Sequence, residues 1–159
     1  SIRRIVVTRP EACAIVLFNR AKDSIVLIKQ FRAPVFTKDG KGYIFELPAG
    51  VIEKNEGPVE TIIRETLEET GYEIHEPQHL NSIYPTCGLM NEIIHLYYAE
   101  VTDGQKVENG GGLEGEHEYI EVIELPAKEV FLMMGKGEIT DAKTLVGLFY
   151  FKNRYGSSL

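Results

Sequence analysis

The feature that most constrains this chain is a glutamate-rich segment at residues 50–72, which reads GVIEKNEGPVETIIRETLEETGY. Pro58 suits the first turn of a helix, and Gly71 suits the left-handed residue that follows a helix end. Between them the apolar side chains recur at helical spacing, which predicts a helix over residues 58–70 with one face toward a core. The residues expected on that face are Val59, Ile62, Ile63 and Leu67.

The predicted helix carries Glu65, Glu68 and Glu69 within one turn. Residues three and four apart lie on one face, and neighbouring like charges there cost a few tenths of a kcal/mol per pair. Arg64 can relieve part of this repulsion by pairing with Glu68 at i+4 or with Glu60 at i−4. The spacing leaves two readings open: a solvated charged face, or a site for a hard cation such as Mg²⁺ or Mn²⁺, which prefers oxygen ligands.

The remaining pattern predicts an α/β (α+β) fold, in which a mixed β-sheet packs between helices. At 159 residues, a single domain covering residues 1–159 is expected. Asp141 is the expected N-cap of the last helix. The expected strands are 12–19 and 24–32, joined as a hairpin, and 79–86, 93–101 and 119–126. A further strand is expected within 42–50; it ends at Pro48, and Gly50 opens a loop. The further helices expected are 127–139 and 141–156.

Charge and hydropathy narrow the possible partners. The net charge is −7 and the pI is about 5.2, which argues against nucleic-acid binding by phosphate neutralisation and hence against an mRNA-decapping role. No apolar run approaches the roughly 20 residues that span a bilayer, so no membrane partner is expected. Basic residues precede an apolar run near the N-terminus, but Pro10 and Glu11 interrupt it, so we expect no signal peptide.

The chain contains two cysteines, Cys13 and Cys87. A single disulfide is one interpretation. Two buried thiols in a reducing cytoplasm are the favoured one, because small intracellular proteins rarely keep disulfides. A cytoplasmic location is therefore expected.

The acidic segment also follows a fixed spacing. Gly50 is followed after five residues by Glu56, and after seven more by the run Arg64–Tyr72, RETLEETGY. This resembles the signature of the Nudix hydrolase family, G-x5-E-x7-R-E-U-x-E-E-x-G-U, where U is bulky and apolar. Every fixed position matches, and the departures are Thr66, where an aliphatic residue is usual, and the mild variant Tyr72. The resemblance implies the Nudix fold and hydrolysis of a diphosphate linked to another moiety.

The resemblance also implies roles for individual residues. Glu65 and Glu69 would be the principal metal ligands, with Glu68 contributing, and Glu69 would be essential to catalysis. The carbonyl of Ala49 would bind metal as well. Arg64 would orient the glutamates through ion pairs. The implied cofactor is Mg²⁺ or Mn²⁺, with two or more ions.

The flanking segments VLIKQFRAPV, FELPAG and YPTCGLMNEIIHLYYAE are similar to the subgroup that acts on ADP-ribose and nucleoside diphosphate sugars, and most similar to its GDP-mannose hydrolases and UDP-sugar diphosphatases. This similarity implies a nucleotide-sugar substrate, cleaved to a nucleoside monophosphate and a sugar phosphate. Arg32 would contact the diphosphate through its planar fork of donors, and Glu46 would lie nearby. A homodimer is implied too.

The subgroup places a catalytic glutamate in a loop that corresponds to the stretch GGGLEGEHEYIEV. By position, Glu116 would be the general base and Glu118 a metal ligand, although the two roles can be exchanged. The alternative for this stretch is a solvated acidic loop. Gly110–Gly112 would give the loop freedom to close. A competing reading of the whole chain is a Nudix-fold sensor that binds a nucleotide sugar without turnover, and the intact glutamates favour the enzyme.

Overall fold

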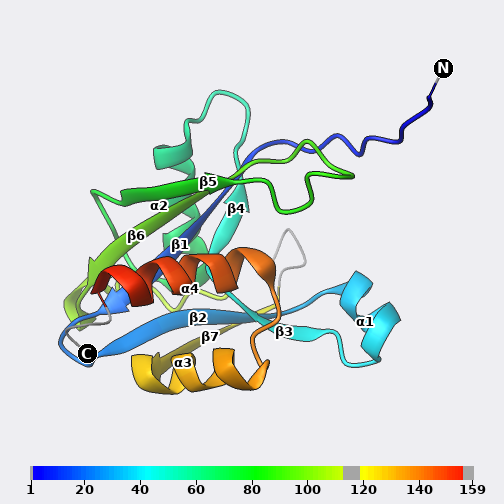
Figure 1. Cartoon of the computed structure of the whole chain (residues 1–159). Coiled ribbons are helices and arrows are strands. Elements are labelled where there is room, and N and C mark those ends of the chain that lie inside the picture. The colour runs from blue at the N-terminus through cyan, green and yellow to red at the C-terminus, as the bar shows by residue number, and fades with distance from the viewer. Residues whose placement is uncertain (1, 113–118, 156–159) are drawn as a thin grey trace.

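The computed structural model describes residues 2–112 and 119–155, and it shows a mixed β-sheet with helices on both faces (Figure 1). The predicted α+β fold is confirmed. Glu116 and Glu118 lie outside the described residues. The strands in the described part are β1 (Ala12–Asn19), β2 (Ser24–Phe31), β3 (Tyr43–Glu46), β4 (Ala49–Val51), β5 (Gln78–Ile83), β6 (Ile94–Val101) and β7 (Ile120–Pro126). The helices are α1 (Ala33–Asp39), α2 (Pro58–Thr70), the 3₁₀ turn η1 (Asp103–Gln105), α3 (Ala127–Lys136) and α4 (Ala142–Tyr155).

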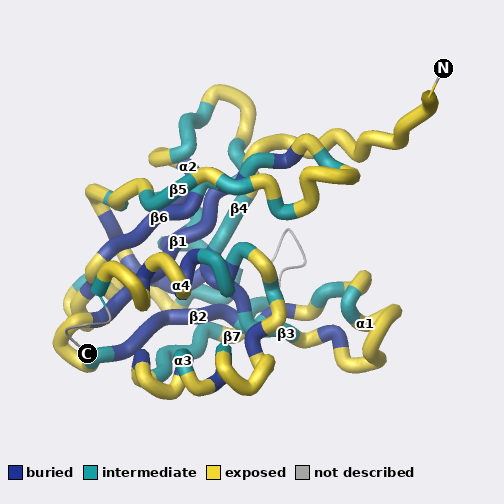
Figure 2. The backbone as a smooth tube through the Cα atoms, in the orientation of Figure 1, coloured by how far each residue is buried: buried dark blue, intermediate teal, exposed yellow. Residues whose placement is uncertain are grey.

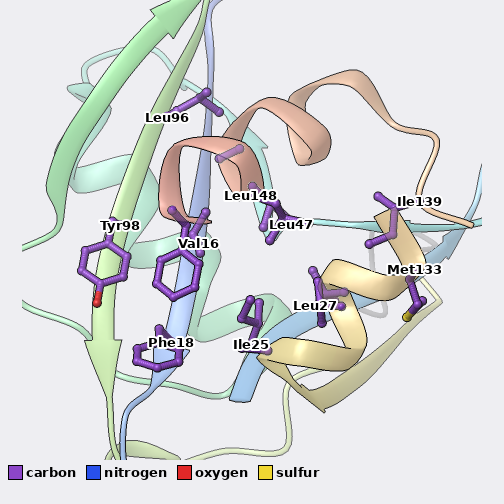
Figure 3. Close-up of a cluster of buried hydrophobic side chains, with 14 of the residues drawn as sticks. Val16, Phe18, Ile25, Leu27, Leu47, Leu96, Tyr98, Met133, Ile139 and Leu148 are labelled. Atoms are coloured by element: carbon purple, nitrogen blue, oxygen red, sulfur yellow. The ribbon is translucent and has the colours of Figure 1, made fainter. Parts of the chain in front are cut away.

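Strand β1 is buried on both faces, as its dark blue trace in Figure 2 shows. Its side chains alternate between two apolar clusters, because successive residues of a strand point to opposite faces. Ile15 and the alternate residues on its side of β1 pack with Ile62 of α2 on one face. Val16 and Phe18 pack with residues of α3 and α4 on the other face, which Figure 3 shows in close-up. This double burial explains the nearly continuous apolar sequence of β1.

The predicted hairpin of β1 and β2 is confirmed, but the two strands pair only near their turn, from Leu17↔Val26 to Asn19↔Ser24. Beyond that point they separate, and the segment 43–51 serves both of them. Its first part, β3, pairs with β2, and its second part, β4, pairs with β1. The strand predicted within 42–50 to end at Pro48 is therefore β3, which ends at Glu46. The loop predicted to open at Gly50 is instead the second short strand β4, and Leu47 and Pro48 form the crossover between the two.

The crossover is fixed by hydrogen bonds to β1 and to α4. The Pro48 carbonyl accepts from the Ile15 N–H at 3.0 Å, and the Leu47 N–H donates to the Thr144 hydroxyl at 2.8 Å. Thr144 in turn donates its own N–H and hydroxyl to Asp141 Oδ2, at 3.0 and 2.7 Å. Asp141 is thus the predicted N-cap, and the first turn of α4 holds the crossover in place.

Two elements differ from the expectations of the sequence. Helix α1 was not predicted, because its seven residues are too few for a periodic pattern; it starts next to Pro34 and ends at Gly40, whose φ is 74°.

In α2 the predicted bounds are confirmed, but Val59 is exposed. The buried side chains of α2 are largely polar: Thr61, Ile62, Thr66, Glu69 and Thr70. Thr66 satisfies its hydroxyl by donating to the Ile62 carbonyl, which explains how a polar residue is accommodated where an aliphatic one is usual.

Both cysteines are free, so the disulfide is excluded. Cys13 is buried, as expected, whereas Cys87 is exposed, so the prediction of two buried thiols is wrong for Cys87. Cys87 lies in the connection between β5 and β6, where no helix or strand covers it. None of the helices in residues 2–112 and 119–155 has the length and apolar character needed to cross a membrane.

We predict that Thr144→Val destabilises the fold by about 1–3 kcal/mol, because it leaves the buried Leu47 N–H without an acceptor while changing little volume. Urea unfolding followed by circular dichroism measures the loss. Thr140→Val is the matched control, since Thr140 is exposed in the preceding turn. Equal stability of the two variants would contradict the anchoring role.

Candidate active site

Helix α2 is held at its end by a close backbone contact. Gly71 follows the helix with φ 77°, and its N–H donates to the Leu67 carbonyl. A Cβ at this position would come within 2.0 Å of the Glu108 carbonyl oxygen. Gly71 is therefore required both by its left-handed conformation and by the approach of residues 105–112.

Residues 105–112 cap the carboxyl end of α2. The N–H groups of Gly111 and Gly112 donate to the carbonyls of Glu69 and Glu68, at 2.9 and 3.1 Å, and the Val107 N–H donates to the Gly71 carbonyl at 2.9 Å. Gly110–Gly112 all have positive φ. These glycines, predicted to give a loop freedom, allow the backbone to dock on the helix end and satisfy its last carbonyls.

Arg64 lies among three carboxylates of the acidic segment. It donates to Glu56 at 2.9 and 3.1 Å and to Glu68 at 2.9 Å, and it pairs with Glu65 at 3.0 Å. The predicted pairing with Glu68 is confirmed, while the other partners are Glu56 and Glu65 rather than the predicted Glu60. The hydrogen bonds from Arg64, and after them the one from Thr61, lower the pKa of Glu56. The Arg64 guanidinium thus offsets much of the repulsion between these neighbouring carboxylates.

Glu65 and Glu69 both reach the start of β4. Glu69 is 2% exposed, and its Oε2 accepts the Ala49 N–H at 2.8 Å. The Glu65 carboxylate lies against Gly50, where an added Cβ would come within 1.9 Å of its Oε1. The crossover and helix α2 therefore bring two carboxylates and the backbone of Ala49 to one place.

A cavity of about 650 Å³ opens at this place. Of the predicted site residues it is lined by Ala49, Glu65, Glu69, Arg64, Arg32 and Glu46, whereas Glu68 is not among the described residues that line it. The cavity also includes residues that sequence reasoning did not select: Arg9, Cys13, Gln30, Glu92, Asp141 and Lys143. Burial, and after it the charge of Glu65, raises the pKa of Cys13 to about 12, so this thiol stays protonated at neutral pH.

Arg32 and Lys143 share one buried carboxylate. Arg32 donates to both oxygens of Glu46, at 2.6 and 2.9 Å. Lys143 pairs with Glu46 and also with Asp141, the latter at 3.0 Å. Burial raises the pKa of Glu46, but the hydrogen bond from Arg32 and the charge of Lys143 outweigh it, and the net pKa is lowered. Glu46, which is 1% exposed, therefore pairs with two cations.

The sequence did contain a signal for Lys143. It stands in the first turn of α4, where the helix dipole disfavours a cation, so an anionic partner nearby was to be expected. Arg9 and Glu92 had no comparable signal. They line another part of the cavity, where the Arg9 Nε donates to Glu92 at 3.2 Å.

The described residues include no group of three or more His, Cys, Asp or Glu side chains placed to hold one metal ion. Their donor set nevertheless fits a hard divalent cation, because Glu65, Glu69 and the carbonyl of Ala49 offer oxygen atoms at the cavity wall. Mg²⁺ commonly binds to one or two carboxylates and completes its shell with water and substrate phosphates. The cations Arg32 and Lys143 also line this cavity and suit an anionic ligand.

Comparison with known proteins agrees with this geometry. The family described as NUDIX domain matches residues 8–145. A GDP-mannose pyrophosphatase of Citrobacter koseri is 40% identical over 93% of this chain and 76% of its own length. The corresponding protein of Shigella flexneri is 39% identical, over 94% of this chain and 78% of its own, and that of Escherichia coli O139:H28 is 38% identical, over 96% and 79%.

The chain therefore belongs to the Nudix family, and the resemblance read from residues 50–72 is confirmed. It is a Nudix hydrolase, an enzyme class that generally needs divalent metal ions. The extent of the domain, predicted as residues 1–159, stays a prediction, and so do the roles of the individual site residues.

We predict that Gly50→Ala displaces the Glu65 carboxylate, because the new Cβ would overlap it. Weaker binding of Mg²⁺ or Mn²⁺ is expected, with the fold retained; calorimetric metal titration and thermal unfolding measure the two effects. Gly88→Ala is the control, since an added Cβ there meets no atom within 4 Å. Unchanged metal affinity in Gly50→Ala would exclude Glu65 as a ligand in this position.

Proposed function

We propose that this Nudix hydrolase cleaves the diphosphate of a nucleoside diphosphate sugar, with GDP-mannose as its substrate, and releases GMP and mannose 1-phosphate. The observation that carries the proposal is the cavity in which the carboxylates of α2 and the cations Arg32 and Lys143 are lining residues. The relatives named GDP-mannose pyrophosphatase support the choice of substrate, because they match nearly the whole chain.

The proposed metal ligands are Glu65, Glu69 and the Ala49 carbonyl, with Glu68 and Glu118 contributing, and the proposed cofactor is Mg²⁺ in two or more sites. Bound divalent ions supply charge neutralisation for the diphosphate and lower the pKa of a water molecule. Arg64 holds Glu56, Glu65 and Glu68 in place through its ion pairs. Helix α2 thus carries three of the proposed ligands, and Arg64 fixes two of them, Glu65 and Glu68.

Arg32 and Lys143 are proposed to bind the diphosphate. A guanidinium can donate to phosphate oxygens in a fork, and an ammonium acts as a point charge. Glu46 fixes the position of both cations, since each of them pairs with its carboxylate. The predicted substrate-binding role of Glu46 would then be exerted through Arg32 and Lys143.

Glu116 is proposed as the general base that takes the proton from the attacking water, with Glu118 as a metal ligand, or the reverse. Both residues lie outside the described part of the chain. The described residues that flank them lie next to the site, which supports the proposal. The Gly112 N–H donates to the Glu68 carbonyl at 3.1 Å, and Ile120 pairs with Gln30 of β2, a residue that lines the cavity.

The experiment that tests the function is a hydrolysis assay, run with Mg²⁺ and with a chelator. An added phosphatase releases inorganic phosphate from the monophosphate products, and this phosphate is measured. Its panel contains GDP-mannose, ADP-ribose, UDP-glucose, ADP-glucose, a dinucleotide and a nucleoside triphosphate. We expect Mg²⁺-dependent turnover, highest on GDP-mannose. Tight calorimetric binding of one nucleotide sugar without turnover of any would favour the sensor interpretation instead.

Glu69→Gln should lower turnover by orders of magnitude, because metal-borne charge stabilisation is worth several kcal/mol of the barrier. Glutamine can still accept the Ala49 N–H, so the fold should be retained. The kcat of each purified variant on the preferred substrate is the measurement. Glu60→Gln is the matched control, since Glu60 lies on the same helix but is exposed. A Glu69→Gln enzyme as active as the control would refute the assignment.

We also propose that the chain is a cytoplasmic homodimer. The two free cysteines support a reducing compartment. The extended arm before β1 supports a dimer, because Ile2, Ile5 and Val6 expose large apolar side chains that a second chain could cover. Light scattering at micromolar concentration should give twice the mass of one chain, and a monomer would exclude this proposal.

A further inference from the structure

Gln30 of β2 carries an amide oxygen that none of the described residues binds. The residue is 8% exposed, and its Oε1 has no hydrogen-bond partner among the described residues. Its side chain lines the cavity of the site. Buried polar atoms in proteins are nearly always paired, so an unpaired one calls for an explanation.

A second unpaired oxygen provides a useful contrast. Asn19 Oδ1 is also buried without a partner among the described residues. The Asn19 amide is nevertheless held from its other side, because Nδ2 donates to Asp103 and Glu124 at 2.8 and 3.2 Å. Asn19 is not among the residues that line the cavity. The unpaired atom of Asn19 therefore accompanies a structural network, whereas that of Gln30 lies beside a ligand-sized space.

The position of Gln30 indicates which part of a ligand it would contact. Residues two apart in an extended strand share a face, so Gln30 lies on the same face of the sheet as Arg32, which follows the end of β2. It pairs across the sheet with Ile44, another lining residue. The Gln30 amide is therefore placed near Arg32, the proposed diphosphate-binding cation, and beside the apolar residue Ile44.

The chemistry of the amide narrows the choice further. A carbonyl oxygen needs a donor, and an ionised diphosphate has none to offer. The hexose of a nucleotide sugar is bonded directly to the diphosphate and carries several hydroxyl groups. Because the last torsion of a glutamine side chain is soft, turning this amide toward such a hydroxyl requires little energy and breaks no hydrogen bond of Oε1.

We infer that Gln30 is a sugar-recognition residue whose amide oxygen accepts a hydrogen bond from a hydroxyl of the hexose. This inference rests on the proposed function, since it assigns part of the same cavity to the sugar. The Gln30 amide oxygen, which has no partner among residues 2–112 and 119–155, would then be paired by the ligand. Such a group lowers stability and gains its partner only in the complex.

The test is Gln30→Met, which keeps the length and approximate volume of the side chain and removes the acceptor. Calorimetry with GDP-mannose in the absence of divalent metal should show about tenfold weaker binding, and kcat/KM with Mg²⁺ should fall by a similar factor. The melting temperature should stay equal or rise, since a buried unpaired oxygen has been removed. A residue with a merely structural role would lower it.

Gln78→Met is the matched control. It makes the same chemical change at an exposed residue of β5, whose side chain accepts a hydrogen bond from Tyr155, and it should leave binding and turnover unchanged. Gln30→Asn, which withdraws the amide by one methylene, should reproduce the loss seen in Gln30→Met. It provides a second test if the methionine variant fails to fold.

Deoxymannose analogues of the substrate identify the contact. The wild type should bind one analogue about tenfold more weakly than GDP-mannose. Gln30→Met should bind that analogue and GDP-mannose with equal affinity, because the substitution and the missing hydroxyl remove the same interaction. Additive losses for every analogue, or unchanged affinity in Gln30→Met, would overturn the inference. Failure of the proposed function is distinct, because the wild type itself would then hydrolyse no nucleotide sugar, whatever the affinity of the Gln30 variants.

Discussion

The hydrogen bond from the Leu47 N–H to the Thr144 hydroxyl fixes the point at which the chain passes from one half of the sheet to the other. On one side of this point stands Glu46, which holds Arg32 and Lys143. On the other side stands Ala49, whose N–H binds Glu69. The separation between the Glu46 cation group and the carboxylate of Glu69 is therefore set by the two backbone residues Leu47 and Pro48. If the proposed roles hold, this short segment also sets how far a phosphate lies from a metal ion.

The charges of the site are arranged as partly compensated groups. Arg64 is surrounded by carboxylates of α2 and the loop before it, while Glu46 is surrounded by cations. Breaking the pairs of Glu46 is costly, because this buried carboxylate would be left without a partner in a medium of low dielectric. Arg64 and Glu46 therefore act through their neighbours, and the groups that they position are the ones that can meet a metal ion or a phosphate.

The elements that could be predicted from the sequence are those with strong local signals. Helix α2 has its predicted bounds, because Pro58 and Gly71 mark both ends and the period between them is helical. The hairpin and the Asp141 cap also follow from local chemistry. Helix α1 could not be predicted in this way, because its seven residues are too few for a periodic pattern. The short strand β4 could not be predicted either, since it depends on the separation of β1 from β2.

The same distinction applies to the site. The glutamates proposed as metal ligands follow from a fixed spacing within one helix, and the structure brings Glu65 and Glu69 to the cavity together with Ala49. Lys143, Arg9 and Gln30 reach that cavity from elements far apart in the sequence, so their proximity is a property of the fold. The predicted role of Val59 in the core failed for a related reason: the periodicity identifies a face, but packing decides how far along the helix that face is covered.

The docking of residues 105–112 on the end of α2 links two segments that are separated in the sequence through backbone hydrogen bonds. The carbonyls of Glu68 and Glu69 are held by the backbone of Gly111 and Gly112, so these glycines are tied to the helix that carries the proposed metal ligands. A change of length before Gly112 would be transmitted to α2. A change of length after Gly112 would not pass through these hydrogen bonds. Natural variants could therefore change the number of residues after Gly112 while leaving helix α2 undisturbed.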